Sequence, residues 1–145
     1  MKNTISKKII IVSLIMCISL SLFSCNSKKE KNGPIVHPIS VTISIDFPEK
    51  AKIPDIINAE FSVEEGSSVL DLTQLYCNVN DIPVTVETTN NYIQGIDNVI
   101  NDYFIKGKSW VYTINNEYSN KSQSEYAVKD GDSIQWKFIR TQGQK

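Results

Sequence analysis

This 145-residue sequence offers few groups that could be brought together for catalysis. The only histidine, His37, lies beside Pro38 in a polar segment, whereas a nucleophilic triad needs an imidazole held on a folded domain. Carboxylate pairs occur at three places: Glu64-Glu65, Asp97 with Asp102, and Asp130 with Asp132. General acid–base work on a sugar would need two of these carboxylates in one cleft, but their positions favour turns and solvated surfaces. We therefore expect no catalytic residue and no enzymatic activity.

The pattern for a bound metal or phosphate is also missing from the sequence. No group of Cys and His has the spacing of zinc ligands, and the six glycines are too scattered for a phosphate-binding loop. A calcium site from Asp97-Asn98 to Asp102 departs from the calcium-loop pattern at most positions. We expect no metal site and no required cofactor.

Cys25 has the strongest chemical signature in the chain. Three lysines precede an uncharged apolar run from Ile9 to Phe23, which is short for a bilayer-spanning helix but suits a signal peptide. The run ends in Leu22-Phe23-Ser24-Cys25, which resembles the lipobox of bacterial lipoproteins. We therefore predict cleavage after residue 24 and attachment of a diacylglyceryl group to the Cys25 thiol. The alternative is an ordinary signal peptide or a short uncleaved anchor.

Lipidation would place the mature chain on the extracytoplasmic face of a bacterial cell membrane, held by its acyl chains, such as palmitate. Residues 25–38 are polar and charged, and this composition predicts a flexible tether. Residues 39–141 then suit one domain. The chain has 15 Lys plus Arg and 16 Asp plus Glu, and residues 1–24 hold three of the lysines and no acid, so the mature part is formally −4. With no basic stripe in the sequence, we do not expect nucleic acid as a partner.

Hydrophobic periodicity predicts how the domain is organised. Val41 to Phe47 alternates with polar residues up to Pro48, as in a half-buried strand, and Val69, Leu72 and Tyr76 recur at helical spacing after a cap at Ser67 or Ser68. Further strands are predicted at Ala59–Val63, Val84–Thr88, Tyr92–Ile96, Trp110–Ile114 and Ile134–Phe138, while Val99–Phe104 is ambiguous. Asn115-Asn116 predicts a tight turn, and Asp130-Gly131 a second hairpin. Strand, strand, helix and then strands indicate an α+β domain of the β-grasp kind, with a mixed sheet packed on a single helix.

Aromatic and amide side chains are concentrated in the second half of the chain, and together they suit a large, uncharged ligand that carries amides. Burial in the core is the competing interpretation. Trp136 alternates in phase with other apolar residues, which favours the core, as it does for Trp110 and Tyr112. Tyr92 and Tyr118 adjoin turn signals and are freer to be exposed. Cys77 follows an apolar helical stretch and is predicted to be a buried thiol.

Four segments in the same order resemble the transcobalamin-like C-terminal domain family: Gly66–Leu72, Val86–Asn98, Ser109–Asn115 and Tyr126–Ile134. The resemblance runs from about Ile39 to Arg140. In the vertebrate cobalamin carriers this domain is the smaller half of a clamp, and the helical half is missing here. The resemblance implies that one face meets the corrin ring, through Tyr92, Gln94, Gly95, Trp110, Tyr112, Asn116, Glu117 and Tyr118. The sequence departs from the family at Asn116, where glycine is usual, and at Ile93-Gln94, which is inserted before the glycine.

The resemblance implies a lipoprotein that captures cobalamin or a related corrinoid as a transported ligand, together with an uptake transporter or a second binding protein. His37 is not expected to bind cobalt, because it lies in the predicted tether. The alternative function is an adhesion or scaffolding module, in which a sheet edge or aromatic patch binds protein or glycan.

Overall fold

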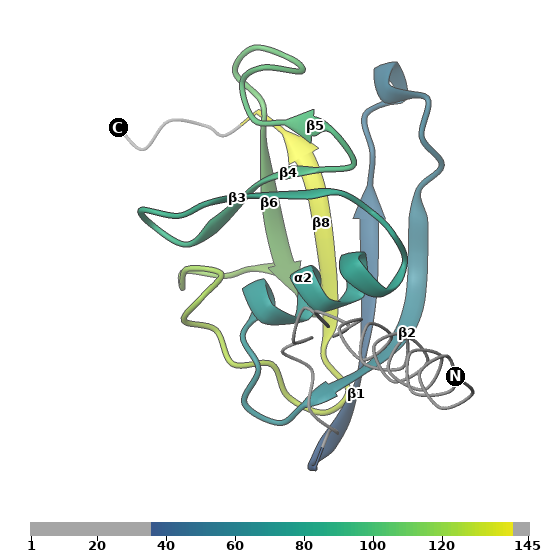
Figure 1. The fold of residues 1–145 in the computed structure, drawn as a ribbon, viewed down its shortest axis with the longest axis vertical. Helices are drawn as coiled ribbons and strands as arrows, with labels where there is room; N and C mark the ends of the chain where they lie inside the picture. The colour runs from purple at the N-terminus through teal and green to yellow at the C-terminus, as the bar shows by residue number, and fades with distance from the viewer. Residues whose placement is uncertain (1–35, 141–145) are drawn as a thin grey trace, which may run out of the picture. The chain divides into compact units, whose positions relative to one another are not determined.

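The first and last strands of the domain lie side by side at the centre of a mixed sheet. The computed structural model describes residues 36–140 (Figure 1). β1 (Pro38–Asp46) pairs antiparallel with β2 (Ile56–Glu64) on one side and parallel with β8 (Ser133–Ile139) on the other. β8 also pairs with β6 (Ser109–Ile114), which pairs with the short β7 (Glu117–Tyr118). The strand order is therefore β2-β1-β8-β6-β7.

The predicted alternation of apolar and polar residues along the strands matches the buried and solvent-facing sides of this sheet. In β8, Ile134, Trp136 and Phe138 are buried while the residues between them are half-buried, and this confirms the predicted core position of Trp136. β2 begins at Ile56, three residues before its predicted start, because a bulge between Ile43 and Ile45 extends the pairing to Ile45 opposite Ile56. A short 3₁₀ helix, η1 (Glu49–Ala51), follows Pro48 at the end of β1.

The α-helix α2 (Val69–Val79) covers one face of the sheet. Ser68, one of the two predicted caps, forms a capping box in which the Asp71 amide donates to the Ser68 hydroxyl at 3.0 Å and the Ser68 amide donates to the Asp71 carboxylate at 3.1 Å. The helix buries Val69 and Leu72 completely. The helical spacing in the sequence is thereby confirmed.

A second, three-stranded sheet was not predicted. It consists of β3 (Val84–Glu87), β4 (Tyr92–Ile96) and β5 (Val99–Ile100), in the order β3-β4-β5. Asp97 and Asn98 both have positive φ, 47° and 63°, so they form a tight turn that makes β4 pair with β5 instead of joining the larger sheet. The expectation of a single sheet was therefore wrong, and the ambiguous segment Val99–Phe104 is a two-residue strand followed by turns.

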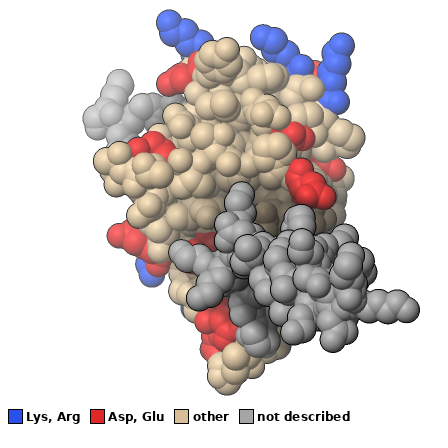
Figure 2. Space-filling view, in the orientation of Figure 1, with Lys and Arg blue, Asp and Glu red and all other residues tan. Residues whose placement is uncertain are grey.

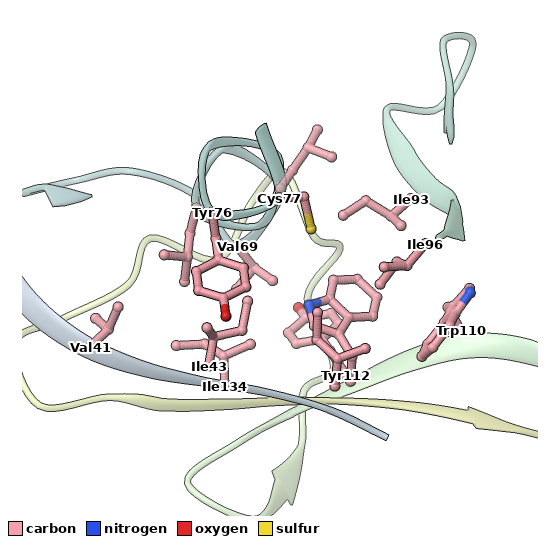
Figure 3. Close-up of a cluster of buried hydrophobic side chains, with 14 of the residues drawn as sticks. Val41, Ile43, Val69, Tyr76, Cys77, Ile93, Ile96, Trp110, Tyr112 and Ile134 are labelled. Atoms are coloured by element: carbon pink, nitrogen blue, oxygen red, sulfur yellow. The ribbon is translucent and has the colours of Figure 1, made fainter. Parts of the chain in front are cut away.

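The hydrophobic core lies between α2 and the two sheets (Figure 3). Ile43, Ile93, Ile96 and Ile134 have no exposed surface, and neither has Trp136, whose indole N–H donates to the Thr73 hydroxyl at 3.0 Å. Two sheets and one α-helix among the described residues confirm the α+β class.

Of the two turns predicted from the sequence, one is confirmed and the other is not a hairpin. Asn115 and Asn116, with φ of 50° and 69°, form the expected tight turn between β6 and β7. Asp130-Gly131 is a turn but not a hairpin, because the preceding Ala127 bridges to Ser68 and not to β8. The predicted closing hairpin is corrected accordingly.

The backbone just before β1 is hydrogen-bonded to β2. β1 starts at Pro38, and the backbone amides of Val36 and His37 donate to the Glu64 carboxylate at 2.8 and 3.0 Å. Pro34–Lys145 forms one compact unit, and its described core consists of its own side chains. The predicted signal peptide, Cys25 and most of the tether lie outside the described residues. Within residues 36–140 no helix has the length and apolar character needed to cross a membrane.

Candidate ligand-binding face

The turn between β3 and β4 is a polar, uncharged protrusion with a fixed shape. Thr88, Thr89, Asn90 and Asn91 are all exposed. Their backbone is held by Glu87, whose carboxylate accepts hydrogen bonds from the Thr89 amide at 2.9 Å and the Asn90 amide at 2.8 Å. Hydrogen bonds from the Thr89 side chain and from these amides hold the pKa of Glu87 below its usual range. The turn thus presents hydroxyl and amide groups in one conformation.

A loop from Ser119 to Glu125 lies against β4 beside this turn. The Gln123 side chain is 9% exposed, and its carbonyl oxygen accepts a hydrogen bond from the Ile93 amide at 2.6 Å. The Tyr112 hydroxyl donates to the Lys121 carbonyl at 2.8 Å, so the loop is tied to the larger sheet as well. We call Thr88–Tyr92, Gln94 and Ser119–Glu125 the turn face. No sequence pattern indicated that this loop would contribute.

The inserted residues that depart from the family pattern form a β-bulge. Thr85 pairs with Gly95 and the next residue, Val86, pairs with Ile93, so Gln94 is the extra residue of β4. A bulge turns its side chain away from the regular alternation of the strand. Tyr92 and Gln94 are both half-buried, and each retains surface for a contact.

Gly95 is a packing residue. It is buried, and a Cβ at this position would lie 3.0 Å from the Ile100 side chain and 3.3 Å from that of Thr85. The middle strand of the small sheet therefore requires glycine for close approach of its neighbours. This buried position offers no surface to a ligand.

Trp110 and Tyr112 lie in the core, as their alternation favoured, and not on the surface implied by the resemblance. They are 4% and 8% exposed, and both rings lie on the helix-facing side of the sheet (Figure 3). The Trp110 ring packs edge-on against Phe47 at 5.6 Å between centroids, and its indole N–H donates to the Val99 carbonyl at 2.7 Å. A ring enclosed in this way has no free face on which a corrin could stack.

The β6–β7 turn lies at one end of the larger sheet. Asn116 and Glu117 are exposed, and Tyr118 is 64% exposed, as its neighbouring turn signal predicted. The Asn115 side chain anchors the turn to the opposite loop, donating to the Asp132 carboxylate at 2.9 Å and accepting from the Ser133 amide at 2.9 Å. Of the eight predicted contact residues, Tyr92, Gln94, Asn116, Glu117 and Tyr118 therefore keep accessible surface, whereas three are buried.

Asp132 from the predicted carboxylate pairs and Cys77 are both buried in the fold. The Asp132 carboxylate is 6% exposed and accepts hydrogen bonds from the Lys129 amide and the Asn115 side chain. Burial raises the pKa of the Cys77 thiol to about 12, with a further contribution from Asp97, and the residue has no exposed surface. Among residues 36–140 no three His, Cys, Asp or Glu side chains are grouped closely enough to hold a metal ion.

Comparison with solved structures shows which fold this is. The crystal structure of haptocorrin in complex with Cbi matches with a TM-score of 0.55 and 19% sequence identity, over 74% of this chain and 27% of that chain. A 1.30 Å structure from Ruminococcus gnavus ATCC 29149, of a protein proposed to bind metal, matches with a TM-score of 0.45 and 18% identity, over 72% of this chain and 98% of that one. The similarity to haptocorrin supports a transcobalamin-like fold. The present chain spans about a quarter of the length of haptocorrin.

Sequence comparison places the chain in a family. No curated protein matches it. A family model, however, matches residues 66–140, which include α2, the small sheet, β6, β7 and β8, and make up just over half of the chain. The chain therefore belongs to the family described as "Domain of unknown function (DUF4430)".

Proposed function

We propose that this protein is a lipoprotein, attached through Cys25 to the extracytoplasmic face of a bacterial membrane, that captures cobalamin or a related corrinoid without catalysis. The observation that supports this proposal most is the similarity of fold to haptocorrin over 74% of the chain. The order of motifs along the sequence supports it independently. In this proposal the lipid anchor keeps the binding face close to a membrane partner that receives the ligand.

The fold proposed here is a β-grasp. Its support is the strand order β2-β1-β8-β6-β7, with the first and last strands parallel at the centre and α2 following the first hairpin. The small sheet β3-β4-β5 is then an insertion between the helix and the second half of the larger sheet. The proposed ligand face lies on this insertion and on the adjacent loop 119–125.

The turn face is the surface that we assign to the corrinoid, because the side chains of Thr88–Asn91 are neutral and their backbone is held by hydrogen bonds to Glu87. A corrin ring carries amide groups at its periphery, and these pair well with the hydroxyl and amide groups of Thr88 to Asn91 and with Gln94. The Tyr92 ring would cover an apolar edge of the macrocycle. In Figure 2 the surface around the small sheet is mostly free of charged groups, which suits a largely uncharged ligand.

A single face of this size covers only part of a corrinoid. The match covers 27% of haptocorrin, and the turn face offers contacts to one side of a ligand. We propose that a membrane transporter or a second binding protein supplies the surface for the other side. Joining two weak faces raises the affinity steeply when both contact the ligand at once.

Isothermal titration of residues 34–145 with cyanocobalamin and with cobinamide tests this proposal, because this unit contains its own core. We expect saturable binding at one site, weakened about tenfold by Tyr92→Ala combined with Gln94→Ala. The matched control is Glu60→Gln, an exposed position on β2, for which we expect unchanged affinity. Absence of heat at about 1 mM ligand, with the fold verified by circular dichroism, would exclude the domain as a binder on its own.

A second function is favoured by one specific feature, the edge strand β2. Among the described strands this strand of nine residues pairs with β1 alone, and Ile57 on it is 74% exposed. An open strand edge can add a strand from another protein. Binding of an extended peptide along β2, seen as protection of its outward amides from hydrogen exchange, would support an adhesion or scaffolding role.

A further inference from the structure

A hollow at the end of the domain has the features of a second binding site. It has a volume of about 370 Å³ and lies where β1 and β8 end, between η1 and the loop 101–108. Its lining is Asp46, Phe47, Pro48, Glu49, Lys50, Ile105, Lys108, Lys137, Phe138 and Ile139. This volume falls within the range of small-molecule sites. We propose that the hollow binds a small organic anion, with a phosphate or carboxylate group on an apolar or ring-shaped body.

Positive charge is concentrated at this end of the domain. The described residues contain eight Lys and Arg, and six of them lie in the three segments that meet here: Lys50, Lys52, Lys106, Lys108, Lys137 and Arg140. Figure 2 shows blue side chains gathered at the upper end of the domain, where these segments lie in Figure 1. Residues so far apart in the chain form no basic run, so this cluster of charge has no signature in the sequence. The gathered charge favours an anion.

The charges inside the hollow leave a cationic excess. Three lysines line it against two carboxylates, Asp46 and Glu49. The Asp46 carboxylate already accepts a hydrogen bond from the Gln135 side chain at 2.9 Å. A single phosphate or carboxylate group between Lys50, Lys108 and Lys137 would balance the excess without displacing that bond.

Apolar side chains form the remaining walls of the hollow. They favour a ligand whose uncharged part is apolar or ring-shaped. Phe47 and Phe138 are 8% and 5% exposed and belong to the core, so the surface that they show to the hollow is fixed. Ile105 and Ile139 add branched aliphatic surface beside them. An inorganic anion alone would leave this apolar surface without a contact.

The walls are held in place before any ligand arrives. In the loop 101–108 the Asp102 carboxylate accepts from the Gly107 amide at 2.8 Å, and the Asp102 amide donates to the Lys108 carbonyl at 2.9 Å. The Phe47 amide donates to the Asp55 carboxylate at 2.7 Å, and the Lys50 ammonium lies 5.8 Å from the centroid of the Phe104 ring. A preformed site loses little entropy when it binds its ligand.

A small anion explains this end of the domain better than a nucleic acid does. The described residues carry 15 Asp and Glu against eight Lys and Arg, so a polyanion extending past the hollow would meet repulsion. The hollow is also separate from the turn face, because none of the residues that line it belongs to the turn face. Anion binding in the hollow is therefore independent of corrinoid capture by the turn face.

Nuclear magnetic resonance titration of residues 34–145 with phenyl phosphate tests the proposal. We expect saturable shifts of the amides in 47–50, 105–108 and 137–139, with weaker binding of inorganic phosphate and none of phenol. Lys50→Gln combined with Lys108→Gln should weaken phenyl phosphate binding about tenfold, as should rising sodium chloride in the unmodified protein. The matched control is Lys121→Gln combined with Lys129→Gln, which removes two exposed lysines outside the hollow.

Three outcomes would overturn the proposal. One is unchanged affinity in the Lys50/Lys108 variant, and another is a set of shifted amides outside the hollow. The third is binding to phosphatidylglycerol vesicles without binding of phenyl phosphate, which would assign the charge to a lipid surface and not to a soluble anion. The salt dependence of the unmodified protein keeps the test decisive if the double variant fails to fold.

Discussion

Replacement of Trp110 by alanine tests whether this ring belongs to the core or to a ligand surface. The ring is 4% exposed, packs against Phe47 and Phe138 at 5.6 and 5.3 Å between centroids, and donates its indole N–H to the Val99 carbonyl at 2.7 Å. Loss of a buried tryptophan ring costs about 3–5 kcal/mol, and the unpaired Val99 carbonyl adds about 1 kcal/mol or more. We therefore expect a free energy of unfolding lower by about 4 kcal/mol or more.

Urea denaturation of residues 34–145, followed by circular dichroism, measures this difference. Trp110→Phe keeps the aromatic contacts but loses the hydrogen bond, so it should cost about 1–2 kcal/mol and remain measurable if the alanine variant does not fold. The control Tyr118→Ala, at a position 64% exposed, should change stability by at most about 0.5 kcal/mol. A Trp110→Ala variant that loses less than about 1 kcal/mol of stability but loses corrinoid binding would refute this assignment of the ring.

Three further predictions concern a thiol, a carboxylate and a hydroxyl. Cys77 has no exposed surface and a pKa raised to about 12, so a disulfide reagent at neutral pH should label it only after denaturation, and rapid labelling of the native protein would contradict this. The pKa of Glu87 is lowered in the folded state, so its stabilisation of the turn is complete above the ordinary value of about 4.5 and lost as the pH falls through the lower folded value. The amide chemical shifts of residues 89 and 90 should change as the turn is lost. If the same pH-dependent change occurs in Glu87→Gln, it does not come from the Glu87 carboxylate. Among residues 36–140 the buried Thr113 hydroxyl has no hydrogen-bond partner, so Thr113→Val should leave the melting temperature unchanged or raise it; a fall of several degrees would contradict this.

Local structure was predictable wherever one interaction decides the conformation. The period of two in β1, β6 and β8 identified the buried faces, because these strands have one face in the core. The Ser68 cap and the Asn115-Asn116 turn were predictable because a side chain or a positive φ fixes each locally. Pairing between distant segments could not be predicted, and the Asp130-Gly131 turn shows why. Its Asp130 carboxylate accepts from the Ser40 amide, 90 residues away, so it connects to β1 and not to a hairpin partner.

The candidate site was predictable only in part, because exposure depends on what packs above each strand. Alternation placed Trp110 and Tyr112 on one face but could not show that β5 and the loop 119–125 cover them. Gly95 belongs to a close strand contact that only the three-dimensional structure reveals. The loop with Gln123 and the gathered lysines of the hollow have no local signature, since each depends on residues that are distant in the chain.

The central claim is that the accessible residues of the turn face bind a corrinoid, while the buried aromatic rings only support the fold. The most direct measurement is the affinity of cobinamide for residues 34–145 and for the variant with Tyr92→Ala and Gln94→Ala. We expect saturable binding to the unmodified domain, about tenfold weaker binding to the variant, and equal melting temperatures for the two proteins. Equal affinities, or no binding to a folded domain, would contradict the central claim.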